Sequence, residues 1–305
     1  MANASRLWGE KVVRLYLPMT MVWIDGLSGE QQRAIVRHYE SFMADRSRAS
    51  RKADVVCLAG RLDQPLGFPS GLFTVNGQYA PNKRRSGGEI EITGLDFSGR
   101  FVRDGRSPIQ ATLSVAREEE LSRSGVLENF LRILLAHHVL DQGGALLHSA
   151  GVLYRNNAYL FSGRSNAGKT TLARKAIAAG ADVLSDDINL VAFENGGFRA
   201  HKVPFSGELG RRAENLSGCG SFPLGGLVLL EKASRLTAIP VTPAEGVAGL
   251  LTGCPYVNDD AREFPALMDF LTRLVFHSPV IRLGVAKEDS FEAIISALLR
   301  CYENV

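Results

Sequence analysis

Cysteine is scarce in this chain, and its spacing predicts neither a metal site nor a redox site. The 305 residues include only four cysteines, which are Cys57, Cys219, Cys254 and Cys301. None of them forms the short paired spacing of a zinc or dithiol motif. Thiols so few and so scattered favour a reducing, cytoplasmic setting.

The chain also lacks long apolar runs and a strong charge of either sign. No stretch approaches the roughly 18 apolar residues that a membrane-spanning helix needs, so we expect no membrane partner. The 35 Lys and Arg residues nearly balance the 32 Asp and Glu residues, which leaves a net charge of +3. A balance so close to neutral gives no electrostatic reason to expect a nucleic-acid partner. The composition, with 45% hydrophobic residues, is that of a globular protein.

Residues 1–125 predict a small α+β domain. A helix is expected at Ser28–Arg46, where Ser28 can act as the N-cap and apolar residues recur at helical spacing. Short strand-like runs surround it, separated by Gly and Pro. The polar and basic segment Asn82–Arg85 is expected to be a turn.

Residues 126–305 predict an α/β domain, because strand-like and helical patterns alternate along them. The segment Val126–Leu140 carries a broad apolar stripe, which indicates a buried helix. The strands expected after it are Ala145–Leu153, Ala158–Phe161, Val183–Leu184 continuing through Ile188–Phe193, Leu224–Glu231 and Pro279–Val285. The expected helices are Lys169–Ala179, Pro243–Thr252, Phe264–His277 and Phe291–Cys301. No internal repeat interrupts this order.

The most specific motif is G-x-x-x-x-G-K-[ST], which the sequence matches in full. Its residues are Gly163, Arg164, Ser165, Asn166, Ala167, Gly168, Lys169 and Thr170. A strand is expected before the motif and a helix after it, which is the context of a phosphate-binding loop. Glycines let successive backbone N–H groups surround an anion at the N-terminus of that helix. We therefore expect a nucleoside triphosphate bound by the loop and Thr171, with Lys169 on its β- and γ-phosphates and Thr170 on Mg²⁺.

Two adjacent acids, Asp186 and Asp187, follow the helix of the loop after one short strand. Ligands of α/β sheets bind at the carboxyl ends of the strands, so the acids and the phosphate loop are expected to face one crevice. One carboxylate can hold Mg²⁺ while the other accepts a proton from an attacking hydroxyl group. A solvated Asp-Asp turn is the alternative that the residues alone leave open.

His148 is a polar residue in an apolar strand shortly before the loop. A single histidine in a strand is more often a hydrogen-bonded core residue than a catalytic one. The other histidines have no motif around them and are expected to be structural. They are His38, His137, His138, His201 and His277.

In combination, these segments resemble the HPr serine kinase/phosphorylase family, whose core is similar to phosphoenolpyruvate carboxykinase. The resemblance rests on His148–Val152, the phosphate loop and Ser185–Asp187. It covers about residues 148–193 and continues loosely through Val203–Glu208. Relatives of this family include peptide-tailoring kinases of ribosomal-peptide pathways. The resemblance implies a phosphate-loop kinase domain over residues 126–305 that uses ATP and Mg²⁺.

The resemblance also implies a role for each matched residue. Asp186 looks like the base that activates the acceptor serine, with His148 beside it and Lys169 at the phosphates. The implied metal ligands are Thr170, Asp187 and Glu208. Farther along the chain, Arg211 and Arg212 are candidates for holding a substrate carboxylate or phosphate, with surface ion pairs as the alternative.

The sequence departs from the family in two places. No Glu-Arg-Gly signature of true HPr kinases is found in the C-terminal region, and residues 1–125 have no clear resemblance to that family. HPr itself is therefore not the expected acceptor. The expected function is transfer of the γ-phosphoryl group of ATP to a hydroxyl, a serine of a peptide or small protein.

Residues 1–125 would then be an accessory or substrate-recognition domain, and a homo-oligomer is compatible with the sequence. Three alternatives remain open. The chain could be a nucleoside triphosphatase without an acceptor, a regulatory nucleotide-binding protein, or a kinase of free serine or another small molecule. A phosphate-release assay with and without candidate acceptors separates them.

Overall fold

The computed structural model describes residues 7–44, 51–62, 74–75, 78–79, 81–94, 97–123, 125–205, 207–209 and 220–304. Helices and strands mix in a protein of two units, Met1–Leu134 and Leu135–Val305. The division falls inside the helix α3 (Val126–Asp141). Among the residues so described, no helix combines the length and apolar character needed to cross a membrane.

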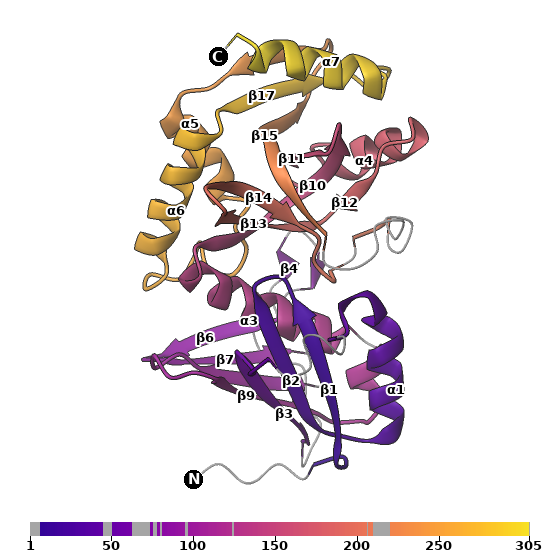
Figure 1. The fold of residues 1–305 in the computed structure, drawn as a ribbon, viewed down its shortest axis with the longest axis vertical. Coiled ribbons are helices and arrows are strands. Elements are labelled where there is room, and N and C mark those ends of the chain that lie inside the picture. The colour runs from indigo at the N-terminus through magenta and orange to yellow at the C-terminus, as the bar shows by residue number, and fades with distance from the viewer. Residues whose placement is uncertain are drawn as a thin grey trace. The chain divides into compact units, whose positions relative to one another are not determined.

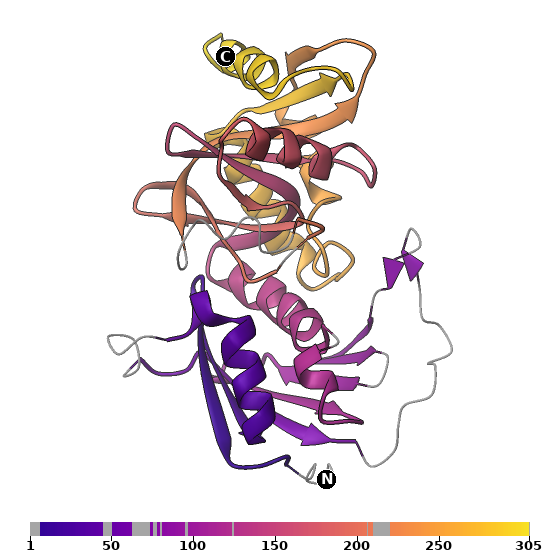
Figure 2. The same cartoon turned by 90° about the vertical axis from the view of Figure 1, so that its right-hand side faces the viewer.

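The first unit contains a seven-stranded sheet with the order β1-β2-β3-β9-β8-β7-β6. Its strands are β1 (Lys11–Leu17), β2 (Thr20–Leu27), β3 (Val55–Arg61), β6 (Asn82–Ser86), β7 (Glu89–Gly94), β8 (Phe97–Val102) and β9 (Ile109–Val115), and a separate pair is formed by β4 (Thr74–Val75) and β5 (Gln78–Tyr79). The helices are α1 (Gly29–His38), the 3₁₀ turn η1 (Glu40–Phe42) and α2 (Glu120–Arg123). Figures 1 and 2 show α1 lying along the sheet, where it contacts β1.

The helix expected at Ser28–Arg46 is shorter than the sequence predicts. Ser28 does act as the N-cap, since its hydroxyl accepts a hydrogen bond from the N–H of Gln31 at 3.1 Å. The helix ends at His38, because Tyr39 leaves helical geometry with a φ of −107° and the 3₁₀ turn η1 follows. The position Arg46 itself lies outside the described residues.

The prediction of a turn at Asn82–Arg85 is wrong. The segment belongs to β6, which pairs antiparallel with β7 from Asn82 opposite Thr93 to Ser86 opposite Glu89. β6 is the last strand of its sheet, so water reaches its basic side chains. Charged residues on an edge strand limit pairing with other chains, and polarity is therefore no evidence for a turn here.

The second unit contains an eight-stranded mixed sheet. Its strands are β10 (Gly144–Tyr154), β11 (Asn157–Ser162), β12 (Val183–Ser185), β13 (Ile188–Glu194), β14 (Gly197–His201), β15 (Ser221–Lys232), β16 (Thr237–Pro240) and β17 (Val280–Val285). Its helices, apart from the end of α3, are α4 (Lys169–Ala178), α5 (Pro243–Leu251), α6 (Phe264–His277) and α7 (Phe291–Tyr302). These helices agree with the predicted ones to within one or two residues at each end. The strands β14 and β16 were not predicted.

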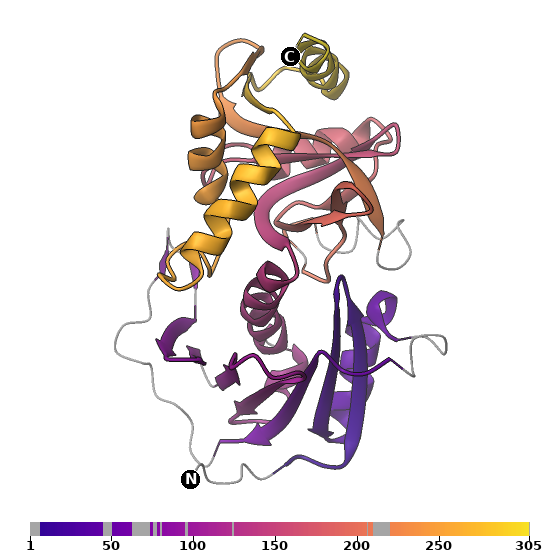
Figure 3. The ribbon, with the colours of Figure 1, turned by 60° about the vertical axis from the view of Figure 1, so that its left-hand side comes forward.

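Helices cover both faces of this second sheet. One core layer joins α4 and α7 to the strands through buried apolar side chains, among them Leu172, Val228, Leu283 and Ile294. Successive residues of a strand point to opposite faces, and Leu229, next to Val228, meets α5 at Gly249. Helices α5 and α6 therefore pack on the other face, where Figure 3 shows them side by side.

Strand pairing brings two chain reversals to the same end of this sheet. β10 is antiparallel to both β11 and β12, with Ser149 opposite Ser162 and Gly151 opposite Ser185. The chain leaves β11 at Ser162 and β12 at Ser185, close to the same part of β10. The strand expected to run from Val183 to Phe193 is consequently interrupted, and Asp186 and Asp187 form the break between β12 and β13.

Candidate functional site

The loop between β11 and α4 is shaped by its two glycines. A Cβ atom on Gly163 would lie 2.6 Å from the carbonyl oxygen of Leu230, so the loop packs too closely against β15 for any side chain. Gly168 has a φ of +106°, a conformation that favours glycine, and precedes α4 without a side-chain cap. With no capping side chain, the first N–H groups of α4 are available to an anion.

Lys169 is buried beneath this loop, with 7% of its surface exposed. Its Nζ donates hydrogen bonds to the carbonyl oxygens of Gly163 at 2.8 Å and Arg164 at 3.2 Å. Burial lowers the pKa of Lys169, and the negative charge of Asp187 opposes that shift. A desolvated cation is thus held at the loop, within electrostatic reach of the acidic pair.

The rest of the loop is open to solvent. Arg164, Ser165 and Asn166 are exposed, and Asn166 adopts a φ of +64° that asparagine tolerates better than most residues. The N–H of Ala167 donates to the carbonyl oxygen of Arg164 at 3.1 Å, which closes the turn. Thr171, in the first turn of α4, is exposed as well.

A cleft adjoins the loop on the side of β15. It has a volume of about 770 Å³ and runs from Gly163–Ala167 past the end of β15 to α5 and Arg282. This volume is within the range of small-molecule sites. The loop therefore borders open space large enough for a nucleotide-sized ligand.

Asp186 is the buried member of the acidic pair, with 5% of its surface exposed. Its Oδ1 accepts a hydrogen bond from the N–H of Leu209 at 3.4 Å, whereas its Oδ2 has no hydrogen-bond partner among the described residues. Burial raises the pKa of Asp186, the backbone N–H of Leu209 and the hydroxyl of Thr170 lower it, and Asp187 adds to the rise. A buried carboxylate oxygen beside the Thr170 hydroxyl is a ligand set that Mg²⁺ prefers.

Asp187 is paired with His148. The Nε2 atom of His148 lies 3.4 Å from Oδ1 of Asp187. Their side chains are 42% and 25% exposed, so solvent and a substrate can reach both. The resemblance implies that His148 lies beside Asp186, but the structure pairs it with Asp187.

Ser185 fixes the turn that carries both acids, and sequence reasoning assigned it no role. Its hydroxyl oxygen accepts hydrogen bonds from the N–H groups of Asp187 at 3.1 Å and Ile188 at 3.3 Å. The same hydroxyl donates to the carbonyl oxygen of Phe205 at 3.3 Å. A serine two residues before an acid is the sequence signal for such a turn.

Gly207 is a second residue that sequence reasoning missed. A Cβ atom at this position would clash with Oδ1 of Asp186, so the chain can pass this close to that carboxylate only with glycine at position 207. The contact is remote in sequence, and no local pattern reveals it. Gly207 and Leu209 therefore both lie against Oδ1 of Asp186.

Glu208, between them, points elsewhere. Its side chain is 72% exposed and forms an ion pair with Arg174 of α4 at 2.9 Å. This geometry gives no support to the expectation that Glu208 completes the metal site. Arg211 and Arg212 lie outside the described residues.

A family model described as "SynChlorMet cassette protein ScmC" matches residues 122–263, which is less than half of the chain. No curated protein matches. A solved structure of the Hpr(Ser) kinase/phosphatase from Coxiella burnetii is 14% identical, with a TM-score of 0.35, over 52% of this chain and 90% of that chain.

Proposed function

We propose that this chain is a phosphate-loop kinase that transfers the γ-phosphoryl group of ATP to a hydroxyl group, a serine of a peptide or small protein. The observation that carries the proposal is the pairing of His148 with Asp187 at 3.4 Å beside the phosphate loop. The buried Lys169 of that loop interacts electrostatically with the same carboxylate. An accessible carboxylate next to a phosphate site is suited to accept a proton from a hydroxyl nucleophile.

The loop would hold the donor. The uncapped N–H groups at the start of α4 and the ammonium group of Lys169 would bind the phosphate oxygens. On binding, Lys169 would exchange its hydrogen bonds to the Gly163 and Arg164 carbonyl oxygens for bonds to phosphate. These charges would offset the negative charge on the transferred group.

Thr170 and Asp186 would hold Mg²⁺, which supplies charge neutralisation at the β- and γ-phosphates. They fit the ion, because Asp186 presents a buried oxygen without a hydrogen-bond partner in the described chain and the Thr170 hydroxyl lies near it. The negative charge that burial disfavours on Asp186 would be stabilised by the cation.

Asp187 would act as the base. Its carboxylate would accept the proton of the acceptor hydroxyl as that oxygen bonds to the γ-phosphorus, while the bond from the γ-phosphorus to the bridging oxygen breaks and ADP leaves. His148 would orient the Asp187 carboxylate. This assignment exchanges the two acids relative to the one that the family resemblance implies. It is supported by exposure, since Asp187 is reachable and Asp186 is buried.

A transfer assay tests the proposal. The protein is incubated with ATP and Mg²⁺, alone, with free serine, or with a library of serine-containing peptides, and phosphoserine is measured by mass spectrometry together with phosphate release. We expect acceptor-dependent phosphoserine in a peptide. Phosphate release that no acceptor alters would instead indicate a triphosphatase, and tight ATP binding without turnover would indicate a regulatory protein.

Lys169→Ala is the variant for this assay. It should weaken ATP binding by about a hundredfold, in the range for loss of one partner of a buried charge contact. Lys175→Ala is the matched control on the same helix, because Lys175 donates to the carbonyl oxygens of Lys287 and Asp289 rather than to the loop. Equal ATP affinities of the two variants would refute the phosphate site.

A further inference from the structure

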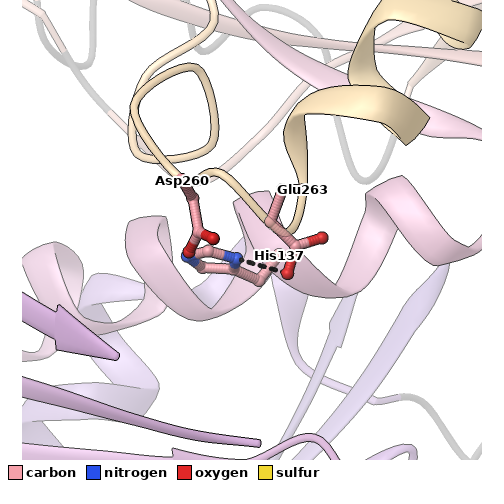
Figure 4. A group of neighbouring side chains, drawn as sticks. All are labelled: His137, Asp260 and Glu263. Carbon is pink, nitrogen blue, oxygen red and sulfur yellow. Dashed lines mark ion pairs between the residues drawn. The ribbon is translucent and has the colours of Figure 1, made fainter. Parts of the chain in front are cut away.

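A histidine and two carboxylates meet away from the phosphate loop. His137 lies near the end of α3, and Asp260 and Glu263 lie in the turn that leads into α6. All three are buried, with exposed fractions of 0%, 7% and 4% respectively. Figure 4 shows the two carboxylates on either side of the His137 ring. Ionisable side chains are rarely buried this fully unless each is matched by a partner or a metal.

The distances suit one shared ion. Each residue offers one ligand atom, an imidazole nitrogen or a carboxylate oxygen, and these three atoms lie within 4.8 Å of one another. The Nδ1 atom of His137 is 3.4 Å from Oε1 of Glu263. Two ligands of a tetrahedral zinc ion with bonds near 2.0–2.1 Å are about 3.3 Å apart. A charge-assisted N–H···O bond is shorter, at about 2.7–2.9 Å.

The backbone of the turn orients the carboxylates. Oδ1 of Asp260 accepts a hydrogen bond from the N–H of Arg262 at 3.1 Å, which fixes the plane of that carboxylate. The carbonyl oxygen of Asp260 accepts from the N–H groups of Glu263 at 3.0 Å and Phe264 at 2.9 Å. Asp260 and Glu263, three residues apart in this turn, therefore both direct their side chains towards α3, as Figure 4 shows.

Charge favours a divalent occupant. Two buried carboxylates bring up to two negative charges into a medium of low dielectric constant, where a cation stabilises them. A divalent ion offsets both while the imidazole stays neutral and acts as a ligand. One imidazole nitrogen with two carboxylate oxygens is a ligand set typical of zinc.

We propose that His137, Asp260 and Glu263 form a structural site for a divalent transition-metal ion of the zinc class. The ion would connect the end of α3 to the start of α6. This role is structural because all three ligands are buried. It is independent of the proposed kinase activity and does not involve the phosphate loop.

Cobalt titration tests this site directly. Chelator-treated protein, without nucleotide, is titrated with Co²⁺, whose visible absorption reports coordination by protein ligands, and the bound Co²⁺ is then displaced with Zn²⁺. We expect one equivalent to bind. His137→Gln and the nearly isosteric Glu263→Gln should each weaken binding by about tenfold or more. Chelator should lower the melting temperature of the wild type and leave that of His137→Gln unchanged.

Matched variants separate this site from others. His201 forms a similar pair with Glu194, also at 3.4 Å, but belongs to no group of three such ligands among the described residues. His201→Gln should therefore bind Co²⁺ like the wild type. Loss of Co²⁺ binding in Asp186→Asn but not in Glu263→Gln would place the ion at the phosphate loop and overturn the proposal. Absence of stoichiometric Co²⁺ and Zn²⁺ binding by the folded wild type would overturn it as well.

Discussion

The imidazole of His148 lies 3.4 Å from the carboxylate of Asp187, whereas the preceding acid, Asp186, is buried beside Thr170. Adjacent residues in a tight turn thus present their side chains to different surroundings. One carboxylate is open to solvent and coupled to an imidazole, and the other is enclosed. Two chemically identical groups are thus held in two different environments.

The first prediction separates the two acids. Asp187→Asn should lower phosphoryl transfer by about 10²–10⁴, the usual contribution of a general base, and keep ATP affinity within about tenfold. Asp186→Asn should instead raise the Mg²⁺ concentration required for half-maximal rate. Steady-state rates over a Mg²⁺ series for both variants give the comparison. If Asp186→Asn loses the rate at saturating Mg²⁺ and Asp187→Asn keeps it, Asp186 is the base.

The second prediction concerns the coupling of His148 to Asp187. If the imidazole only orients that carboxylate, His148→Gln should lower the transfer rate, and adding it to Asp187→Asn should cause little further loss. A double-mutant cycle on the single-turnover rate measures this coupling. Independent, multiplicative losses would show that the two side chains act separately.

The third prediction concerns the close approach of Gly207 to Asp186. Gly207→Ala places a Cβ atom where Oδ1 of Asp186 now lies, so the carboxylate must move. We expect slower transfer and a higher Mg²⁺ concentration for half-maximal rate, measured as above. Gly197→Ala is the control, because a Cβ atom there meets nothing within 4 Å and the residue needs no positive φ. Similar kinetics of the two variants would argue against a role for the Gly207 contact.

The fourth prediction is a pH dependence of stability. Burial raises the pKa of Asp186 above its ordinary value, so the folded protein binds this proton more tightly than the unfolded chain does. The contribution of Asp186 to stability is therefore greatest below the ordinary carboxyl pKa and is lost as the pH rises through the raised one. Without Mg²⁺, Asp186→Asn should gain stability relative to the wild type over this range.

Thermal melts from pH 4 to pH 8 check this dependence. The difference in melting temperature between Asp186→Asn and the wild type should grow with pH and then level off. A constant difference for Asp186→Asn would mean that burial does not shift the pKa of this carboxyl group.

Local sequence patterns determined most of the second unit. The helices α4 to α7 follow from apolar periodicity and end signals, and the loop from Gly163 to Thr170 follows from a motif whose glycines permit its backbone. Both depend on residues close together in the chain. In the first unit the same reasoning misread Asn82–Arg85, since a polar segment can pair as an edge strand with a neighbour that local pattern does not reveal.

Contacts between distant segments were decided by the tertiary structure alone. The sequence placed Asp186 and Asp187 after a strand, but which of them meets His148 depends on how β12 and β13 pair with β10. The approach of Gly207 to Asp186 and the meeting of His137 with Asp260 and Glu263 likewise join segments far apart in the chain. Composition and spacing determine which ionisable side chains the protein contains and where they lie along the chain. The burial of those side chains and their contacts, which set their pKa values and their exposure to solvent, exist only once the chain has folded.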